Sequence, residues 1–229
     1  MIRIYLLLLL NIFSLCILAQ ENTDWSNLKR YAQENAELLK NNSNKNKVIF
    51  MGNSITEGWV KADATFFTNN GYIGRGISGQ TSYQFLLRFR EDVIKLKPSI
   101  VVINAGTNDI AENTGIYNEE YTMDNIISMV ELAQLHQIKV ILTSVLPAAT
   151  FGWNTTIKDA PQKIEKLNKR IAIYAQMHNI PYVDYYSSMV YGENKALNPK
   201  YTKDGVHPTI EGYKVMENII YTTINKLQK

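Results

Sequence analysis

The stretch SIVVINAG, residues 99–106, decides the fold of this chain. Its apolar run, residues 100–103, consists entirely of β-branched residues, and the polar residue Asn104 follows directly. Strands that are apolar at every position are buried on both faces, as in a parallel sheet that helices cover on both sides. The stretch therefore predicts a central strand of an α/β protein.

Similar apolar runs occur at intervals on both sides of this stretch, with helix-like segments after them. The runs are KVIFMG (47–52), YIGRGIS (72–78), KVILTSVLP (139–147) and IPYVDYY (180–186). The helix-like segments cover about 80–96, 119–137, 160–178 and 209–227. Alternating strands and helices form βαβ units, and the chain has no internal repeat. We therefore predict one doubly wound domain over residues 47–229: a three-layer α/β/α, flavodoxin-like fold with a five-stranded parallel sheet.

The residues before this domain fall into two parts. Residues 1–19 begin with one cation, Arg3, continue as a long apolar stretch and end at Ala19, which is the pattern of a signal peptide cleaved after Ala19. We therefore expect a secreted or periplasmic protein, with no stable membrane insertion after cleavage. An uncleaved membrane anchor is the alternative. Residues 20–46 predict an N-terminal amphipathic helix, over about 21–40, and a polar linker.

Charge and cysteine content exclude several kinds of function. The formal net charge of +3 over 229 residues is too small to indicate a nucleic-acid partner. The single cysteine, Cys16, lies inside the predicted signal peptide, so we expect the mature chain to use neither disulfides nor thiol chemistry. Leu15 stands before Cys16, where a lipidation signal needs a small residue.

Polar residues and glycines follow the predicted strands, where an α/β sheet places its functional sites. The groups are Gly52-Asn53-Ser54, Ser78-Gly79-Gln80, Gly106-Thr107-Asn108-Asp109 and, before the last helix, Asp204-Gly205-Val206-His207-Pro208. The carboxyl ends of parallel strands lie at the same edge of the sheet. We therefore expect these four groups to meet there.

Ser54 has two interpretations. Ser54 and Glu57 fit a capping box, in which a serine side chain caps a helix and a glutamate three residues later reaches back. The alternative is a catalytic nucleophile at the end of the first strand. The residues around Ser54 do not decide between these two interpretations.

The four groups together contain what acyl transfer requires. Ser54 is the candidate nucleophile, His207 the candidate general base, and Asp204 the group that fixes the orientation of His207. The candidate donors to a developing oxyanion are the main-chain N–H groups of Ser54 and Gly79 and the side-chain amide of Asn108. Gly79 has no side chain to keep a substrate carbonyl away.

In these groups the sequence resembles the SGNH hydrolases, also called the GDSL esterase and lipase family. The family's four blocks are a Gly-x-Ser, a Gly, a Gly-x-Asn-Asp and an Asp-x-x-His, and they occur here in that order and with similar spacing. Asn53 stands where the family name has Asp. The resemblance implies an SGNH hydrolase domain over residues 47–229 and a carboxylic ester hydrolase without metal or organic cofactor.

Other candidates have simpler explanations. Ser78 is a second candidate nucleophile, but no Gly-x-Ser-x-Gly elbow surrounds it. GRGISG, residues 74–79, fits a dinucleotide fingerprint, yet it follows the second strand and the next strand lacks the expected terminal acid. His136 and His178 fall at predicted helix ends, where histidine favours the negative end of the helix dipole. No second histidine stands at metal-binding spacing from His207.

The loop LPAATFGWNTTIKDAP, residues 146–161, is expected to border the site because it follows the fourth strand. Phe151 and Trp153 are candidate substrate-binding residues, for a sugar ring or an acyl chain. The family resembled includes lysophospholipases, thioesterases and carbohydrate acetylesterases. We expect a small-molecule or glycan ester as substrate and favour a short acyl group, acetyl, on a carbohydrate. A lysophospholipase or thioesterase is the alternative, and a non-catalytic carbohydrate-binding domain is the alternative of another class.

Overall fold

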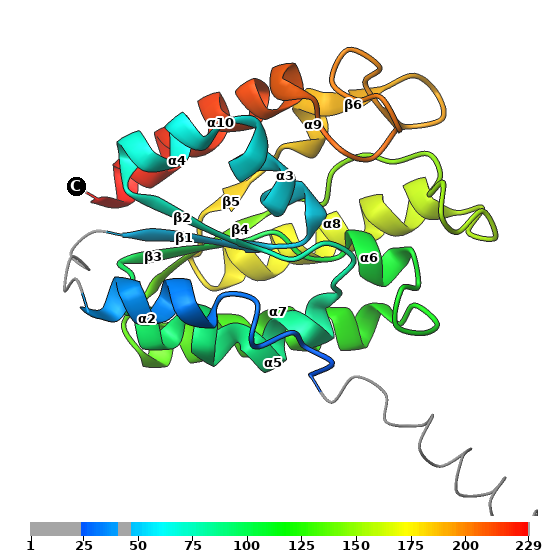
Figure 1. Ribbon diagram of the computed structural model, residues 1–229. Coiled ribbons are helices and arrows are strands. Elements are labelled where there is room, and N and C mark those ends of the chain that lie inside the picture. Colours follow the sequence, from blue (N-terminus) through cyan, green and yellow to red (C-terminus); the bar gives the residue numbers. More distant parts are fainter. Residues whose placement is uncertain (1–23, 41–46, 229) are drawn as a thin grey trace, which may run out of the picture.

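A parallel five-stranded sheet forms the centre of the computed structural model, which describes residues 24–40 and 47–228 (Figure 1). The strands are β1 (Val48–Gly52), β2 (Tyr72–Gly76), β3 (Ile100–Ile103), β4 (Lys139–Thr143) and β5 (Tyr182–Val183). Their order in the sheet is β2-β1-β3-β4-β5. This is the flavodoxin-like order, so the predicted fold is confirmed. The predicted signal peptide lies outside the described residues.

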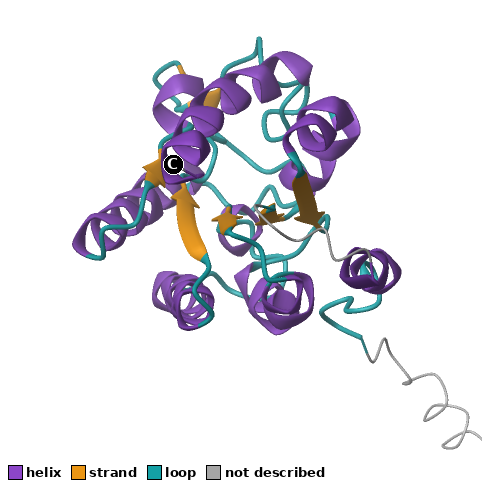
Figure 2. Ribbon diagram, turned by 90° about the vertical axis from the view of Figure 1, so that its left-hand side faces the viewer, coloured by secondary structure: helices purple, strands orange, loops and turns teal. Residues whose placement is uncertain are grey.

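Two layers of helices cover the sheet, as the views in Figures 1 and 2 show. On one face lie α2 (Ala32–Lys40), α5 (Ser82–Asp92), α7 (Glu119–Leu135) and α8 (Ala160–Met177). On the other lie α3 (Ser54–Ala62), α4 (Ala64–Asn70) and α10 (Ile210–Gln228). Alternate strand residues enter the two layers: in β1, Ile49 and Met51 pack on the first, Val48 and Phe50 on the second. The continuous apolar runs are thus explained by burial on both faces.

Several short elements complete the chain: η1 (Ile94–Leu96), α6 (Thr107–Ile110), α9 (Tyr186–Met189) and the hairpin of β6 (Val190–Tyr191) and β7 (Ala196–Leu197). None of them was predicted as a separate element. The N-terminal helix also begins later than predicted, at Ala32. The Asp24 carboxylate accepts hydrogen bonds from the main-chain N–H groups of Leu28 and Lys29, which holds the preceding residues in turns instead.

The strand register aligns the carboxyl ends of the first three strands. Gly52 pairs with Gly76, and Met51 pairs with Ile103. The loops after these strands therefore start at the same edge of the sheet. None of the helices in the described parts of the chain combines the length and apolarity needed to cross a membrane.

Gly76 lets α3 lie directly against the end of β2. A Cβ atom built at Gly76 would lie 2.3 Å from the main-chain nitrogen of Glu57 and 2.6 Å from the main-chain oxygen of Asn53. At Gly74 a Cβ atom would lie 2.3 Å from a methyl group of Val60, also on α3. These two glycines of the GRGISG stretch thus have a packing role in this fold.

Gly76→Ala is expected to lower the free energy of unfolding by about 1–3 kcal/mol, because its methyl group would meet main-chain atoms that cannot move independently of α3. Gly152→Ala is the matched control. A Cβ atom there meets nothing within 4 Å, so the change is expected to stay within about 0.5 kcal/mol. Urea denaturation of both variants measures the difference, and equal stability of the two would contradict the packing role of Gly76.

Candidate active site

Ser54 is the first residue of α3, directly after the turn that ends β1. The N-cap is Asn53, whose side-chain oxygen accepts a hydrogen bond of 3.0 Å from the main-chain N–H of Ile55. The capping-box interpretation of Ser54 is therefore wrong. Glu57 instead accepts hydrogen bonds from the main-chain N–H of Ser78 at 2.9 Å and from its hydroxyl at 2.6 Å. Because Asn53 caps the helix, the Ser54 hydroxyl is available for other contacts.

The Ser54 hydroxyl lies against His207, and His207 lies against Asp204. Ser54 Oγ is 2.8 Å from His207 Nε2, and His207 Nδ1 is 2.6 Å from Asp204 Oδ2. A carboxylate accepts only, so Nδ1 carries the proton and Nε2 is left to accept from the serine hydroxyl. The three residues thus form a continuous hydrogen-bonded series from hydroxyl to carboxylate.

The Asp204 carboxylate is held by more than the imidazole. Its Oδ1 atom accepts hydrogen bonds from the main-chain N–H groups of His207 at 2.8 Å and of Val206 at 2.9 Å. Partial burial alone would raise the pKa of Asp204, but the hydrogen bonds from the main chain and ring of His207 and from Val206 outweigh it. Together they lower this pKa to about 2. Asp204 is therefore ionised at neutral pH and accepts the Nδ1 proton of His207.

The loops after β2 and β3 are joined beside Ser54. Asn108, at the start of α6, donates from its side-chain amide to the main-chain oxygen of Gln80 at 2.9 Å. Asn113 donates in the same way to the main-chain oxygen of Gly79, also at 2.9 Å. Gly79 has a φ angle of +79°, a conformation that residues with side chains rarely adopt. The Asn108 amide keeps a second N–H that this contact does not use.

Asp109, the last residue of the third block, has a different position. Its buried carboxylate accepts hydrogen bonds from the main-chain N–H and the hydroxyl of Ser82, at the start of α5. Burial raises the pKa of Asp109, while the contacts with Ser82 act in the opposite direction. Asp109 thus joins α6 to α5 and does not line the hollow beside Ser54.

All four sequence blocks border one hollow of about 300 Å³. Its lining residues are Ser54, Ser78, Gly79, Asn108, Asn113, Trp153 and His207. Asn113 was not among the predicted site residues, because an asparagine in a polar loop carries no signal that separates it from its neighbours. Asn113 is recognisable only from its contacts in the folded chain.

The two aromatic candidates of the loop after β4 differ in exposure. The Trp153 side chain is 48% exposed, its ring centre lies 6.2 Å from that of His207, and its indole N–H donates to Asn113 Oδ1 at 2.8 Å. Phe151 is fully buried and packs beneath Trp153, with ring centres 5.3 Å apart. The prediction that Phe151 contacts substrate therefore needs correction: its side chain is part of the core.

The remaining candidates lie where their local sequence indicated. Ser78 borders the hollow, but its hydroxyl donates to the carboxylate of Glu57, whereas His207 Nε2 contacts Ser54. His136 and His178 are the C-caps of α7 and α8. Across residues 24–40 and 47–228, no three His, Cys, Asp or Glu side chains are grouped so that they could hold a metal ion.

Comparison with known proteins identifies the family. Residues 50–215 match the GDSL-like lipase/acylhydrolase family. A crystal structure of a Bacteroides fragilis protein assigned as an acylhydrolase is 69% identical, with a TM-score of 0.89, and the match covers 91% of this chain and 100% of that one. A GDSL-like lipase from Bacteroides thetaiotaomicron is 66% identical, with a TM-score of 0.85, over 89% of this chain and 99% of that one.

An acetylxylan esterase from Xylanibacter ruminicola is 23% identical over 214 residues, which are 78% of this chain and 43% of that protein. This chain thus spans less than half the length of that relative. The family match, in contrast, extends from β1 into α10 and includes all four sequence blocks. The chain therefore belongs to the GDSL-like lipase/acylhydrolase family and is a carboxylic ester hydrolase.

Proposed function

We propose that this acylhydrolase is an exported serine esterase that removes short acyl groups, acetyl above all, from carbohydrates. The observation that carries the mechanism is the distance of 2.8 Å between Ser54 Oγ and His207 Nε2, with Asp204 on the far nitrogen of the ring. This is the arrangement of nucleophile, general base and orienting carboxylate that acyl transfer uses.

In the proposed reaction, Ser54 Oγ forms a bond to the ester carbonyl carbon while its proton moves to His207 Nε2. The tetrahedral intermediate then loses the alcohol, which takes the proton from Nε2, and an acyl-Ser54 remains. Water attacks the acyl group, again giving its proton to Nε2. The second intermediate then breaks its bond to Ser54 Oγ, which takes the proton from Nε2, and the carboxylic acid is released. Asp204 stays ionised and stabilises the imidazolium form of His207.

The negative charge on the former carbonyl oxygen needs donors beside Ser54. We assign this role to the main-chain N–H groups of Ser54 and Gly79 and to the second N–H of the Asn108 amide. Support comes from the position of all three residues around one hollow. Removal of one such donor typically costs about 10²–10³-fold in rate.

The size of this hollow favours a small acyl group. Its volume of about 300 Å³ is at the lower end for small-molecule sites. The half-exposed indole of Trp153 offers a flat apolar face at the rim, on which a sugar ring can stack. The acetylxylan esterase among the relatives agrees in substrate class.

Two alternatives are kept. A lysophospholipase or thioesterase of the same family would use the same three residues on a longer acyl chain. A non-catalytic carbohydrate-binding domain would keep the fold and Trp153 but would not use Ser54 as a nucleophile. The complete set of Ser54, Asp204 and His207 supports the enzyme.

Export is part of the proposal and rests on the sequence of residues 1–19, with its single early cation, apolar stretch and small residue before the cleavage point. N-terminal sequencing of the protein recovered from outside the cytoplasm is expected to begin at Gln20. A chain recovered only with Met1 intact would favour the retained membrane anchor instead.

Ser54→Ala is expected to lower kcat on a nitrophenyl acetate substrate by about 10⁴-fold or more, because no other group can form the acyl intermediate. Ser78→Ala is the matched control. It removes the second serine hydroxyl at the hollow and is expected to keep most of the activity. The reverse result, an inactive Ser78→Ala variant and an active Ser54→Ala variant, would identify Ser78 as the nucleophile.

The acyl preference follows from the small hollow. With purified enzyme, kcat/KM is expected to fall from acetyl to octanoyl and palmitoyl esters, and acetylated oligosaccharides are expected to release acetate. A steady rise with chain length would support the lysophospholipase or thioesterase. Failure of a fluorophosphonate probe to label Ser54, together with binding of the oligosaccharides, would support the non-catalytic domain.

A further inference from the structure

The orientation of the Asn108 amide depends on the main-chain oxygen of Gln80. A side-chain amide carries an acceptor on one side and two N–H donors on the other. The hydrogen bond from Asn108 Nδ2 to this oxygen fixes the positions of the amide nitrogen and the amide oxygen. It leaves one N–H of the amide for another acceptor, and Asn108 lines the hollow. If the Gln80 oxygen moved away, the amide could rotate and present its own oxygen to a developing oxyanion, where two negative groups would repel.

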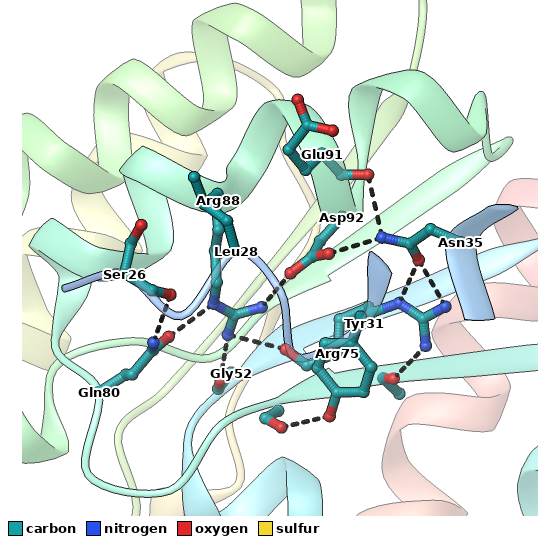
Figure 3. A network of polar contacts seen from close by, with 12 residues as sticks. Ser26, Leu28, Tyr31, Asn35, Gly52, Arg75, Gln80, Arg88, Glu91 and Asp92 are labelled. Carbon is teal, nitrogen blue, oxygen red and sulfur yellow. Dashed lines mark hydrogen bonds and ion pairs between the residues drawn. The ribbon is translucent and has the colours of Figure 1, made fainter. Parts of the chain in front are cut away.

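The side chain of Gln80 is held at both ends. Its Oε1 atom accepts a hydrogen bond of 2.6 Å from Nε of Arg88, and its Nε2 atom donates to the main-chain oxygen of Ser26 at 2.8 Å (Figure 3). Only 4% of Gln80 is exposed. Gln80 therefore sits in a fixed position between α5 and the N-terminal segment before α2.

Arg88 is itself fixed by contacts with the strand ends. Its fully buried guanidinium donates from Nη2 to the main-chain oxygens of Gly52 and Arg75, at 2.9 Å each. From Nη1 it donates to Asp92 at 2.8 Å. Figure 3 shows these contacts meeting at one group. Gln80 is thus tied to the cation that also holds β1 two residues before Ser54.

We propose that Gln80 is a positioning residue of the esterase reaction, which holds the Gly79 N–H and the Asn108 amide at the oxyanion through its bonds to Arg88 and Ser26. This inference rests on the proposed function, because it requires an oxyanion at that place. It also gives the segment around Ser26, which precedes the family match at residue 50, a part in the reaction.

Loss of the Gln80 contacts is expected to destabilise the transition state more than the bound ester. The charge on the carbonyl oxygen is small in the bound ester and large in the tetrahedral state, so misplaced donors lower kcat and leave ground-state binding nearly unchanged. Substitution of a residue that only stabilises the fold would instead lower the melting temperature and leave kcat of the folded enzyme unchanged. The ratio of the effects on kcat and KM therefore separates the two roles.

The test uses the full mature chain with two loss variants and one rescue variant. Gln80→Met keeps the length of the side chain but loses both hydrogen bonds, and Gln80→Asn is too short to reach both partners. Each is expected to lower kcat on nitrophenyl acetate by about 10²-fold, while KM stays within about twofold. A loss of about this size is expected when the oxyanion donors are displaced by about 1 Å. Gln80→Glu is a partial rescue: it keeps the acceptor for Arg88 but loses the donor to the Ser26 oxygen, so its kcat is expected to lie between those of the wild type and Gln80→Met.

Ile220→Val is the matched control for stability. Ile220 is fully buried on α10, in the opposite helix layer, and has no polar contact to lose. It is expected to lower the melting temperature while kcat stays unchanged. Where Gln80→Met does not fold, Gln80→Asn, which keeps an amide in the buried site, gives the deciding value.

The inference is overturned if the Gln80 loss variants keep the kcat of Ile220→Val, or if KM alone changes. In that case, an active wild type and an inactive Ser54→Ala leave the proposed function intact. A wild type that neither hydrolyses the acetate ester nor reacts with a fluorophosphonate overturns the proposed function, and the role of Gln80 with it.

Discussion

The parallel register of β1, β2 and β3 is the constraint on which the candidate site depends. Gly52 pairs with Gly76 and Met51 with Ile103, so the three strands end at the same edge of the sheet. A shift by one residue would turn each following side chain to the opposite face of the sheet. Ser54, the Gly79 loop and α6 lie around one hollow because these strands end together.

Burial of a cation adds a second constraint to the first. The guanidinium of Arg88 is fully buried, and a buried charge without partners is costly. Main-chain oxygens at the ends of β1 and β2, the carboxylate of Asp92 and the amide of Gln80 supply those partners. The hydrogen bonds of the Arg88 guanidinium therefore hold the ends of β1 and β2 and the loop after β2 in fixed positions relative to each other.

Periodicity and residue type predicted the fold and most of the candidate site, and particular residues show which features they could not predict. The β-branched run 100–103 predicted a central strand because burial on both faces leaves a local pattern. Ser54 and Glu57 matched a capping box as well as a nucleophile, since the same residue types serve both. Asn53 and Ser54 are both residue types that cap helices, so the sequence does not separate them. In the structure Asn53 is the cap, because its side chain reaches the N–H of Ile55. Phe151 and Trp153 stand two residues apart, yet only Trp153 is exposed.

By itself, the sequence determined the α/β fold, the order of its elements and the residue types available at the strand ends, because these depend on local hydrophobic patterns and on chain order. The tertiary structure alone decided which of these residues touch. It set the Ser54–His207 contact across 153 residues of sequence, the place of Asn113 beside Trp153 and the link from Ser26 through Gln80 to Arg88. Such contacts depend on how distant segments pack, and a side chain's partners across the fold leave no periodic signal in the sequence.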